Sequence, residues 1–240
     1  MAFLKKHFSF QHPTFGRSKS DKHSEPYKRS VYYFWYEFLK RNDDYKECCR
    51  QGGLGEMAGL YADFGDVFEM DFKTWWQEND RGARLFAEAP LPSVRQIKSP
   101  DDLQISGRML NVCLPLELPR RFLEDELKKL LDKHHKGERG VRTNKDSTAL
   151  YPVDGDFNRA TLSRCLKVYD MRQQFPEMKL WQLAVEVGSG SSSDRETAFK
   201  KTKHGAASRM VLSNFASRDL RHSRQMIKNA GQGRFPGPRK

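Results

Sequence analysis

Eight basic side chains near the carboxyl end of the sequence have the chemistry to bind a polyanion. They are Arg195, Lys200, Lys201, Lys203, Arg209, Arg218, Arg221 and Arg224. Lys and Arg neutralise phosphates, and such contacts supply much of the affinity of proteins for nucleic acids. We therefore predict that these residues bind nucleic acid, with duplex DNA as the expected partner.

Three predicted helices must position these side chains. Residues 179–188 place Leu180, Leu183, Ala184 and Val187 on one face of a 3.6-residue period, and Gly188 ends the helix. A second helix is predicted over 195–203, capped by Asp194. A third is predicted over 206–229, after a break at Gly205.

The run Leu-x-x-Leu-Ala-x-x-x-Gly at 180–188 resembles the first helix and turn of helix-turn-helix DNA-binding domains, and the resemblance extends over 179–203. It implies that the helix 195–203 enters a groove and reads bases, with Ser191, Ser192 and Ser193 meeting the backbone at its start. The arginines of the third helix would then contact phosphates. The serine-rich stretch 189–193 is longer than the turn of a minimal helix-turn-helix. An ordinary short helix ending in glycine remains the alternative.

The distribution of charge supports a polyanionic partner for the same region. The net charge is +12, and residues 138–240 carry 20 Lys and Arg against 10 Asp and Glu. Residues 30–137 instead carry 16 against 19. Such asymmetry is typical of nucleic-acid-binding proteins. A basic segment without a partner is the competing interpretation.

Residue patterns typical of enzymes and cofactor sites do not occur. No serine lies in a Gly-x-Ser-x-Gly elbow, and no His-Glu-x-x-His is present. The glycines of 51–59 are not followed by Lys-Ser or Lys-Thr, as a phosphate-binding loop requires. His134, His135 and Glu138 lie at a helix end that runs into a charged loop, so we do not expect them to converge on a zinc ion. The acidic residues of 63–71 are expected to form a solvated face. We therefore predict no catalytic residues, no metal and no cofactor.

An aromatic segment near the amino end carries a second resemblance. Ser30 can cap a helix from Val31 to about Arg41, whose aromatic stripe is expected to lie in a core. The phrase Phe-Trp-Tyr-Glu-Phe-Leu-Lys-Arg-Asn-Asp-Asp-Tyr at 34–45 resembles the opening of bacterial mobile-element proteins described as transcriptional regulator-like. Asp43 stands where that family has proline. The resemblance implies a phage- or mobile-element-type regulator of transcription.

The expected fold is mainly α with a minor β element, in two small domains. Residues 1–29 are predicted to form a disordered basic and aromatic arm. An α-rich domain follows over 30–136, with a helix starting at Asp71, a strand near 109–114 and a helix after Pro119. Residues 137–156 form the expected linker, 157–233 the helix-turn-helix-like basic domain, and 234–240 a disordered tail.

The composition also limits location and partners. No apolar run approaches the roughly 20 residues of a membrane span, and the amino end lacks the apolar core of a signal peptide. The four cysteines have no metal-like spacing and are expected to be reduced in a cytoplasmic protein. The main hypothesis is a DNA-binding protein whose N-terminal domain forms a homodimer or binds a protein. A phage or mobile-element assembly protein is the second hypothesis, and a nucleic-acid-processing enzyme the third.

Overall fold

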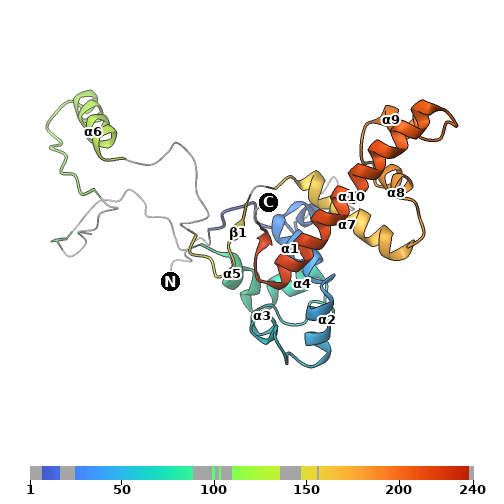
Figure 1. Ribbon diagram of the computed structural model, residues 1–240. Helices are drawn as coiled ribbons and strands as arrows, with labels where there is room; N and C mark the ends of the chain where they lie inside the picture. The colour runs from blue at the N-terminus through green and yellow to red at the C-terminus, as the bar shows by residue number, and fades with distance from the viewer. Residues whose placement is uncertain are drawn as a thin grey trace. The chain divides into compact units, whose positions relative to one another are not determined.

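The computed structural model describes residues 7–16, 25–88, 99–100, 103, 110–135, 147–155 and 157–237. These residues form a mainly helical protein with one two-stranded parallel sheet, as the sequence predicts (Figure 1). No helix in these ranges is long and apolar enough to cross a membrane.

The helices before residue 90 are short. They are α1 (Val31–Leu39), α2 (Asp43–Arg50), α3 (Ala58–Phe64), α4 (Phe72–Gln77) and α5 (Arg81–Phe86), with 3-10 turns at Pro26–Arg29 and Glu78–Asp80. The later helices are α6 (Arg120–His134), α7 (Arg159–Gln174), α8 (Leu180–Glu186), α9 (Ser192–Thr197) and α10 (Lys203–Gly231). The strands are β1 (Val153–Asp154) and β2 (Phe235–Pro236).

The chain divides into two compact units whose boundaries differ from those of the two expected domains. One unit contains residues 1–90 together with 147–240, and the other contains 91–146. The expected boundary falls at 137–156, yet one hydrophobic core includes buried side chains from both sides of it, such as Trp35, Leu162 and Ile227. The periodicity of each helix shows which face is buried but not which helix covers that face.

Helix α1 lies at the centre of this core. Ser30 caps it by accepting a hydrogen bond from the Tyr32 backbone N–H, as predicted. Seven of its nine residues are buried, so the aromatic segment is core rather than surface. The ring of Trp35 lies within 5.2–6.1 Å, centre to centre, of the rings of Phe86, Phe235 and Tyr151. Trp35 thus joins three segments that are distant in sequence.

The end of the chain is not the disordered tail predicted for 234–240. Phe235 is fully buried, and β2 pairs in parallel with β1 through the register Val153 to Phe235. The Asn229 side chain donates to the Pro236 carbonyl, and the Gly237 N–H donates to the Asp154 carbonyl. A buried aromatic ring and these hydrogen bonds fix the segment; residues 238–240 lie outside the described residues.

The amino-terminal segment also differs from the predicted arm, because residues 7–16 pack on the core. Phe8, Phe10 and Phe15 are partly buried against it. Ser30 Oγ donates to the Gln11 carbonyl, and the Glu88 N–H donates to the His7 carbonyl. These aromatic side chains follow no helical or strand period, so the sequence did not predict that they pack on core residues distant in the chain.

Glu88 forms hydrogen bonds with two segments that are distant in sequence, one near Ser9 and one at Ser147 and Thr148. Its carboxylate accepts hydrogen bonds from Ser9 Oγ at 2.5 Å, Ser147 Oγ at 2.6 Å and the Thr148 N–H at 2.7 Å. Residues 147–155 of the predicted linker are therefore attached to the core unit. Tyr151, whose N–H donates to the Leu85 carbonyl, extends this attachment. The linker residues 137–146 lie outside the described residues.

The pKa of Glu88 provides a test of this attachment. Burial raises it, but the hydrogen bonds from Ser147, Ser9 and Thr148 outweigh burial and lower it to about 2. A carboxyl with a depressed pKa stabilises the fold above its unfolded value near 4.5, and this stability is lost as the pH falls toward 2. Glu88→Gln should therefore reduce stability at pH 7 and weaken the loss between pH 4.5 and 2, measured by urea unfolding. Equal pH profiles for both proteins would contradict this role.

The predicted strand at 109–114 does not form in its described part, because residues 110–114 belong to no helix or strand. The two paired strands lie instead at 153–154 and 235–236. An apolar run predicts a strand only if a neighbouring strand is available to satisfy its backbone groups.

Helix α6 forms after Pro119, as predicted, and is amphipathic. None of its residues is buried within the described residues, and Phe122 and Leu131 are about half exposed. Leu123, Leu127 and Leu130 lie on the same side at helical spacing. These three leucines are partly buried, so the apolar face of this helix is incompletely covered.

Candidate nucleic-acid interface

Helices α7, α8 and α10 share a second cluster of buried apolar side chains. Leu183 and Ala184 of α8 meet Leu212 and Ala216 of α10, and Ala198 closes the cluster after α9. The helix predicted over 179–188 therefore forms with its predicted apolar face inward. Gly188 follows it with a φ of 75°, a left-handed conformation that suits glycine.

The second predicted helix, 195–203, is replaced by a shorter one. Helix α9 ends at Thr197, and Ala198–Thr202 form a loop before α10. The cap of α9 is Ser191, which accepts from the Asp194 N–H, so Asp194 is not the cap. The serine-rich stretch belongs partly to the helix because serine satisfies the free N–H groups of a first turn.

The predicted break at Gly205 is also wrong, because Gly205 lies inside the first turn of α10. Thr202 caps this helix, with its hydroxyl accepting from the Gly205 N–H at 3.1 Å. A Cβ atom at Gly205 would lie 2.0 Å from the Lys200 carbonyl oxygen. The glycine is therefore needed for the close packing of the loop on the helix.

Three of the eight predicted basic residues are engaged within the protein. Arg195 Nη1 donates to the Gly190 carbonyl at 2.7 Å, in the turn after α8. Arg209 Nη1 donates to the Ala198 carbonyl at 2.7 Å and the Lys200 carbonyl at 3.2 Å. The Arg218 guanidinium lies 4.9 Å from the centre of the Phe215 ring. The first two arginines bind carbonyls in short connections between helices.

The other five predicted residues point their charges to solvent. Lys200 and Lys201 lie in the loop before α10, and Lys203 opens the helix. Arg221 and Arg224 lie further along α10 and are exposed. The number of charged residues in the sequence did not distinguish these exposed residues from Arg195 and Arg209. Which arginine lies near a backbone carbonyl depends on the tertiary structure.

Lys228 of α10 is a further exposed basic residue, outside the eight predicted contacts. Lys228 is exposed on α10 and follows Arg221 and Arg224 at the spacing i, i+3 and i+7. These three side chains therefore share one face of the helix. The amphipathic pattern of residues 206–229 already places Lys228 on the polar side of this helix with Arg221 and Arg224.

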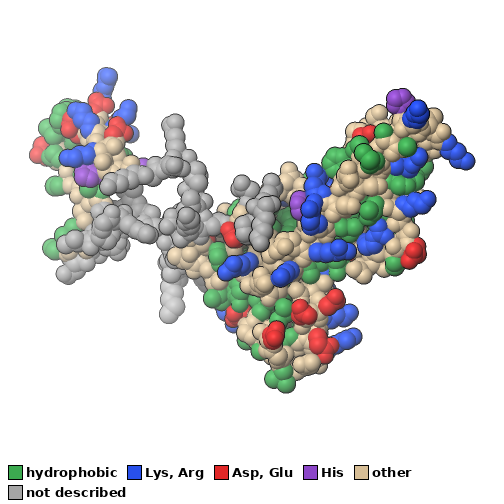
Figure 2. All heavy atoms as spheres, in the orientation of Figure 1, with side chains coloured by type: hydrophobic (Ala, Val, Ile, Leu, Met, Phe, Trp, Pro, Cys, Tyr) green, Lys and Arg blue, Asp and Glu red, His purple; other side chains and the backbone are tan. Residues whose placement is uncertain are grey.

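The positive charge of this region is visible on the surface. Figure 2 shows Lys and Arg side chains along α10 and around α9, while acidic side chains gather near α2 and α3. Residues 157–237 contain 15 Lys and Arg against 6 Asp and Glu. Because Asp219 is fully buried, α10 presents no carboxylate to solvent along this helix.

Buried Asp219 holds this surface together. Its carboxylate accepts from Arg164 Nε of α7 at 2.6 Å and from Ser189 Oγ at 3.1 Å. Ser223 Oγ is 2.7 Å from both the Asp219 and Cys165 carbonyl oxygens. The network connects α7, the turn after α8, and α10. It therefore fixes the basic helix relative to the turn that precedes α9.

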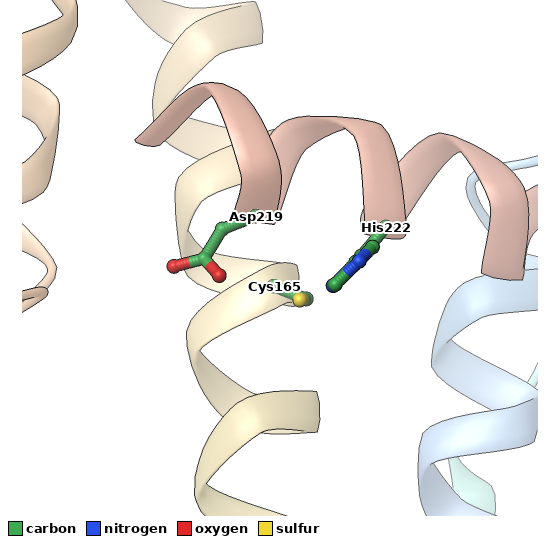
Figure 3. A group of neighbouring side chains, drawn as sticks. All are labelled: Cys165, Asp219 and His222. Carbon is green, nitrogen blue, oxygen red and sulfur yellow. The ribbon is translucent and has the colours of Figure 1, made fainter. Parts of the chain in front are cut away.

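Asp219 also belongs to a group with metal-ligand chemistry. Figure 3 shows the Cys165 sulfur and the His222 ring facing each other, with Asp219 beside them, and their ligand atoms lie within 4.8 Å. The Asp219 carboxylate is already bound by Arg164 and Ser189. Burial raises the pKa of the Cys165 thiol to about 11, which favours the protonated form. These properties fit a core network better than a thiolate metal centre.

A hollow lies elsewhere in the same unit. It has a volume of about 460 Å³ and is lined by Phe8, His12, Phe15, Trp76, Gln77, Asp80 and Ala83. Asn79 and Asp80 beside it have positive φ angles of 50° and 56°. None of the predicted basic residues lines this hollow, so it is separate from the basic surface.

Comparisons with protein-family models, curated protein sequences and solved structures gave no match to this chain.

Proposed function

We propose that this protein binds duplex DNA through a basic surface formed by the α9–α10 loop and the exposed side of α10. The observation that carries the proposal is the set of exposed cations Lys200, Lys201, Lys203, Arg221 and Arg224, whose charges no described carboxylate pairs. Such charges attract phosphates, and neutralising a phosphate releases the counterions condensed on the nucleic acid. Arg195 and Arg209 shape the surface by holding its connections.

The class of DNA-binding protein that we propose is a regulator of the phage or mobile-element type. This part rests on the resemblance at 34–45. Most side chains of that segment are buried, and Asn42 caps α2 while donating to the Ile227 carbonyl at 3.1 Å. The segment therefore stabilises the fold. Proteins with a similar segment could share this fold and still bind different partners.

A salt series tests the proposed function. Affinity for a mixed-sequence duplex, measured by fluorescence anisotropy, should fall linearly with salt on a log–log plot, with a slope of about −0.9 per neutralised phosphate. Arg221→Ala should reduce the magnitude of this slope by about 1 and weaken binding to all sequences alike. Arg221 is exposed, so its replacement should leave the melting temperature within about 1–2 °C of the parent.

The matched control is Arg50→Ala, an exposed arginine of α2 that is paired with Glu47 and lies away from the proposed surface. It removes the same charge from the whole protein but should leave the slope unchanged. If both variants change binding equally, attraction depends on net charge alone and the proposed surface is wrong. Absence of binding to duplex at about 50 mM salt contradicts the DNA proposal itself.

A second candidate function is assembly with a protein partner, and α6 is the observation that favours it. Its side chains Leu123, Leu127 and Leu130 are only partly buried, and Phe122 and Leu131 are about half exposed. An amphipathic helix whose apolar face is incompletely covered is a common way to bind another helix or a groove. Leu127→Asp should abolish such association in light scattering while leaving DNA binding intact.

A further inference from the structure

The Phe199 ring, next to the lysines of the basic surface, lies outside the buried apolar cluster of this region. Phe199, in the loop between α9 and α10, is 64% exposed, whereas its neighbour Ala198 is buried. Lys200, Lys201 and Lys203 follow it directly. The loop and the first residue of α10 therefore present one apolar ring to solvent together with three cations.

The backbone of this loop is fixed by contacts from α10. Arg209 Nη1 binds the carbonyls of Ala198 and Lys200, and Thr202 caps the helix. The 2.0 Å approach that a Gly205 Cβ atom would make shows how closely the loop lies on the helix. A loop held in this way loses little conformational freedom when a ligand binds. The exposed position of Phe199 is therefore built into the fold.

A second aromatic residue supports the ring. The Trp181 ring of α8 lies 5.3 Å from the Phe199 ring, centre to centre, at an angle of 78°. This edge-to-face contact holds Phe199 in place without covering it. The two rings come from the first helix of the predicted helix-turn-helix and from the loop after α9.

We infer that Phe199 stacks on a nucleic-acid base while the adjacent lysines contact the phosphates on either side. The inference rests on the proposed nucleic-acid binding and adds a contact to a base. Reading of bases was predicted for a helix over 195–203, but α9 ends at Thr197. Every base has a π-face, so an aromatic ring among cations binds nucleic acid with little regard to sequence. The lysines favour this polyanion over an apolar protein surface, where their charges would lose water.

The test uses the full chain with a labelled single strand and the matching duplex. Phe199→Ala should weaken binding to the single strand by about 5- to 150-fold, the loss expected for one stacked base. The salt slope should not change, because no charge is removed. Phe199→Tyr should retain binding because it keeps the ring. Lys200→Ala should instead lower the magnitude of the slope by about 1.

Comparison of the single strand with the duplex shows whether Phe199 contacts an unpaired base or a step between base pairs. A loss of affinity for the single strand alone supports stacking on an unpaired base. An equal loss for the duplex supports insertion of the ring at a base step. Unchanged affinity of Phe199→Ala for both probes overturns the inference but leaves the proposed function standing, provided Lys200→Ala still changes the slope. Absence of binding by the parent protein overturns both.

Trp181 supplies a measurement that needs no Phe199 variant. The other tryptophans, Trp35, Trp75 and Trp76, are at most 5% exposed, so acrylamide should quench mainly Trp181. Bound single strand should protect Trp181 from acrylamide, and Trp181→Phe should remove this signal. Full accessibility of Trp181 in a saturated complex overturns the inference.

Discussion

Trp35→Ala should lower the free energy of unfolding by about 3–5 kcal/mol, the usual loss for a large buried aromatic side chain. Trp35 is fully buried, and its ring lies near those of Phe64, Phe86, Tyr151 and Phe235. Its removal leaves a cavity where segments from both ends of the sequence meet. Chemical denaturation followed by circular dichroism gives the measurement.

The unfolding curve should also show whether the shared core acts as one unit. Because Ile227 of α10 lies in the same core as Trp35, signals from the amino-terminal helices and from Trp181 should shift together. If the Trp181 transition stays at the parent denaturant concentration, the two parts fold independently.

Two variants serve as controls for Trp35→Ala. Trp35→Phe should cost much less, because it keeps a ring and removes a buried N–H that has no partner among the described residues. Leu54→Ala removes an apolar side chain that is 68% exposed and should change stability by at most about 0.5 kcal/mol. Equal losses from Leu54→Ala and Trp35→Ala would contradict the placement of Trp35.

Asp219→Ala should lower the free energy of unfolding by about 3 kcal/mol, near the lower end for breaking a buried ion pair. The Asp219 carboxylate is almost fully buried, while the Arg164 side chain keeps 25% of its exposure. Asp219 raises the pKa of Arg164 through their hydrogen bond. Without it, a partly buried guanidinium remains unpaired. Urea unfolding measures the loss.

Asp170→Ala is the matched control, because Asp170 also binds an arginine at 2.6 Å but keeps 49% of its side-chain exposure. Arg41, the partner of Asp170, keeps Glu37 as a second carboxylate at 2.8 Å, so losing the half-exposed Asp170 should cost at most about 1 kcal/mol. Arg164→Met combined with Asp219→Leu should recover much of the loss, since no charge is then left buried. Similar costs for Asp219→Ala and Asp170→Ala would contradict the importance of burial.

The position of Asp219 gives the same variant a consequence for binding. The network connects α7 and the turn at Ser189 to α10. Asp219→Ala should therefore weaken DNA binding even at temperatures where the protein remains folded, although it makes the net charge more positive. Tighter binding would show that the network does not position the surface.

Local rules predicted several helices well. Ser30 and Asp71 cap the helices they were expected to cap, and Pro119 precedes α6. The apolar period of 179–188 identified a real buried face. Caps and periods involve residues within a few positions of each other, so the sequence contains the information needed to predict them.

The sequence by itself therefore determined the helical class, many helix starts and the location of the positive charge. Only the tertiary structure decided that Phe235 and residues 7–16 join the core, because their partners are distant in sequence. It also decided that Arg195 and Arg209 bind backbone carbonyls while Lys200 and Arg221 remain exposed. Carbonyls left free at the ends of helices need donors, and which arginine reaches one depends on how the helices pack.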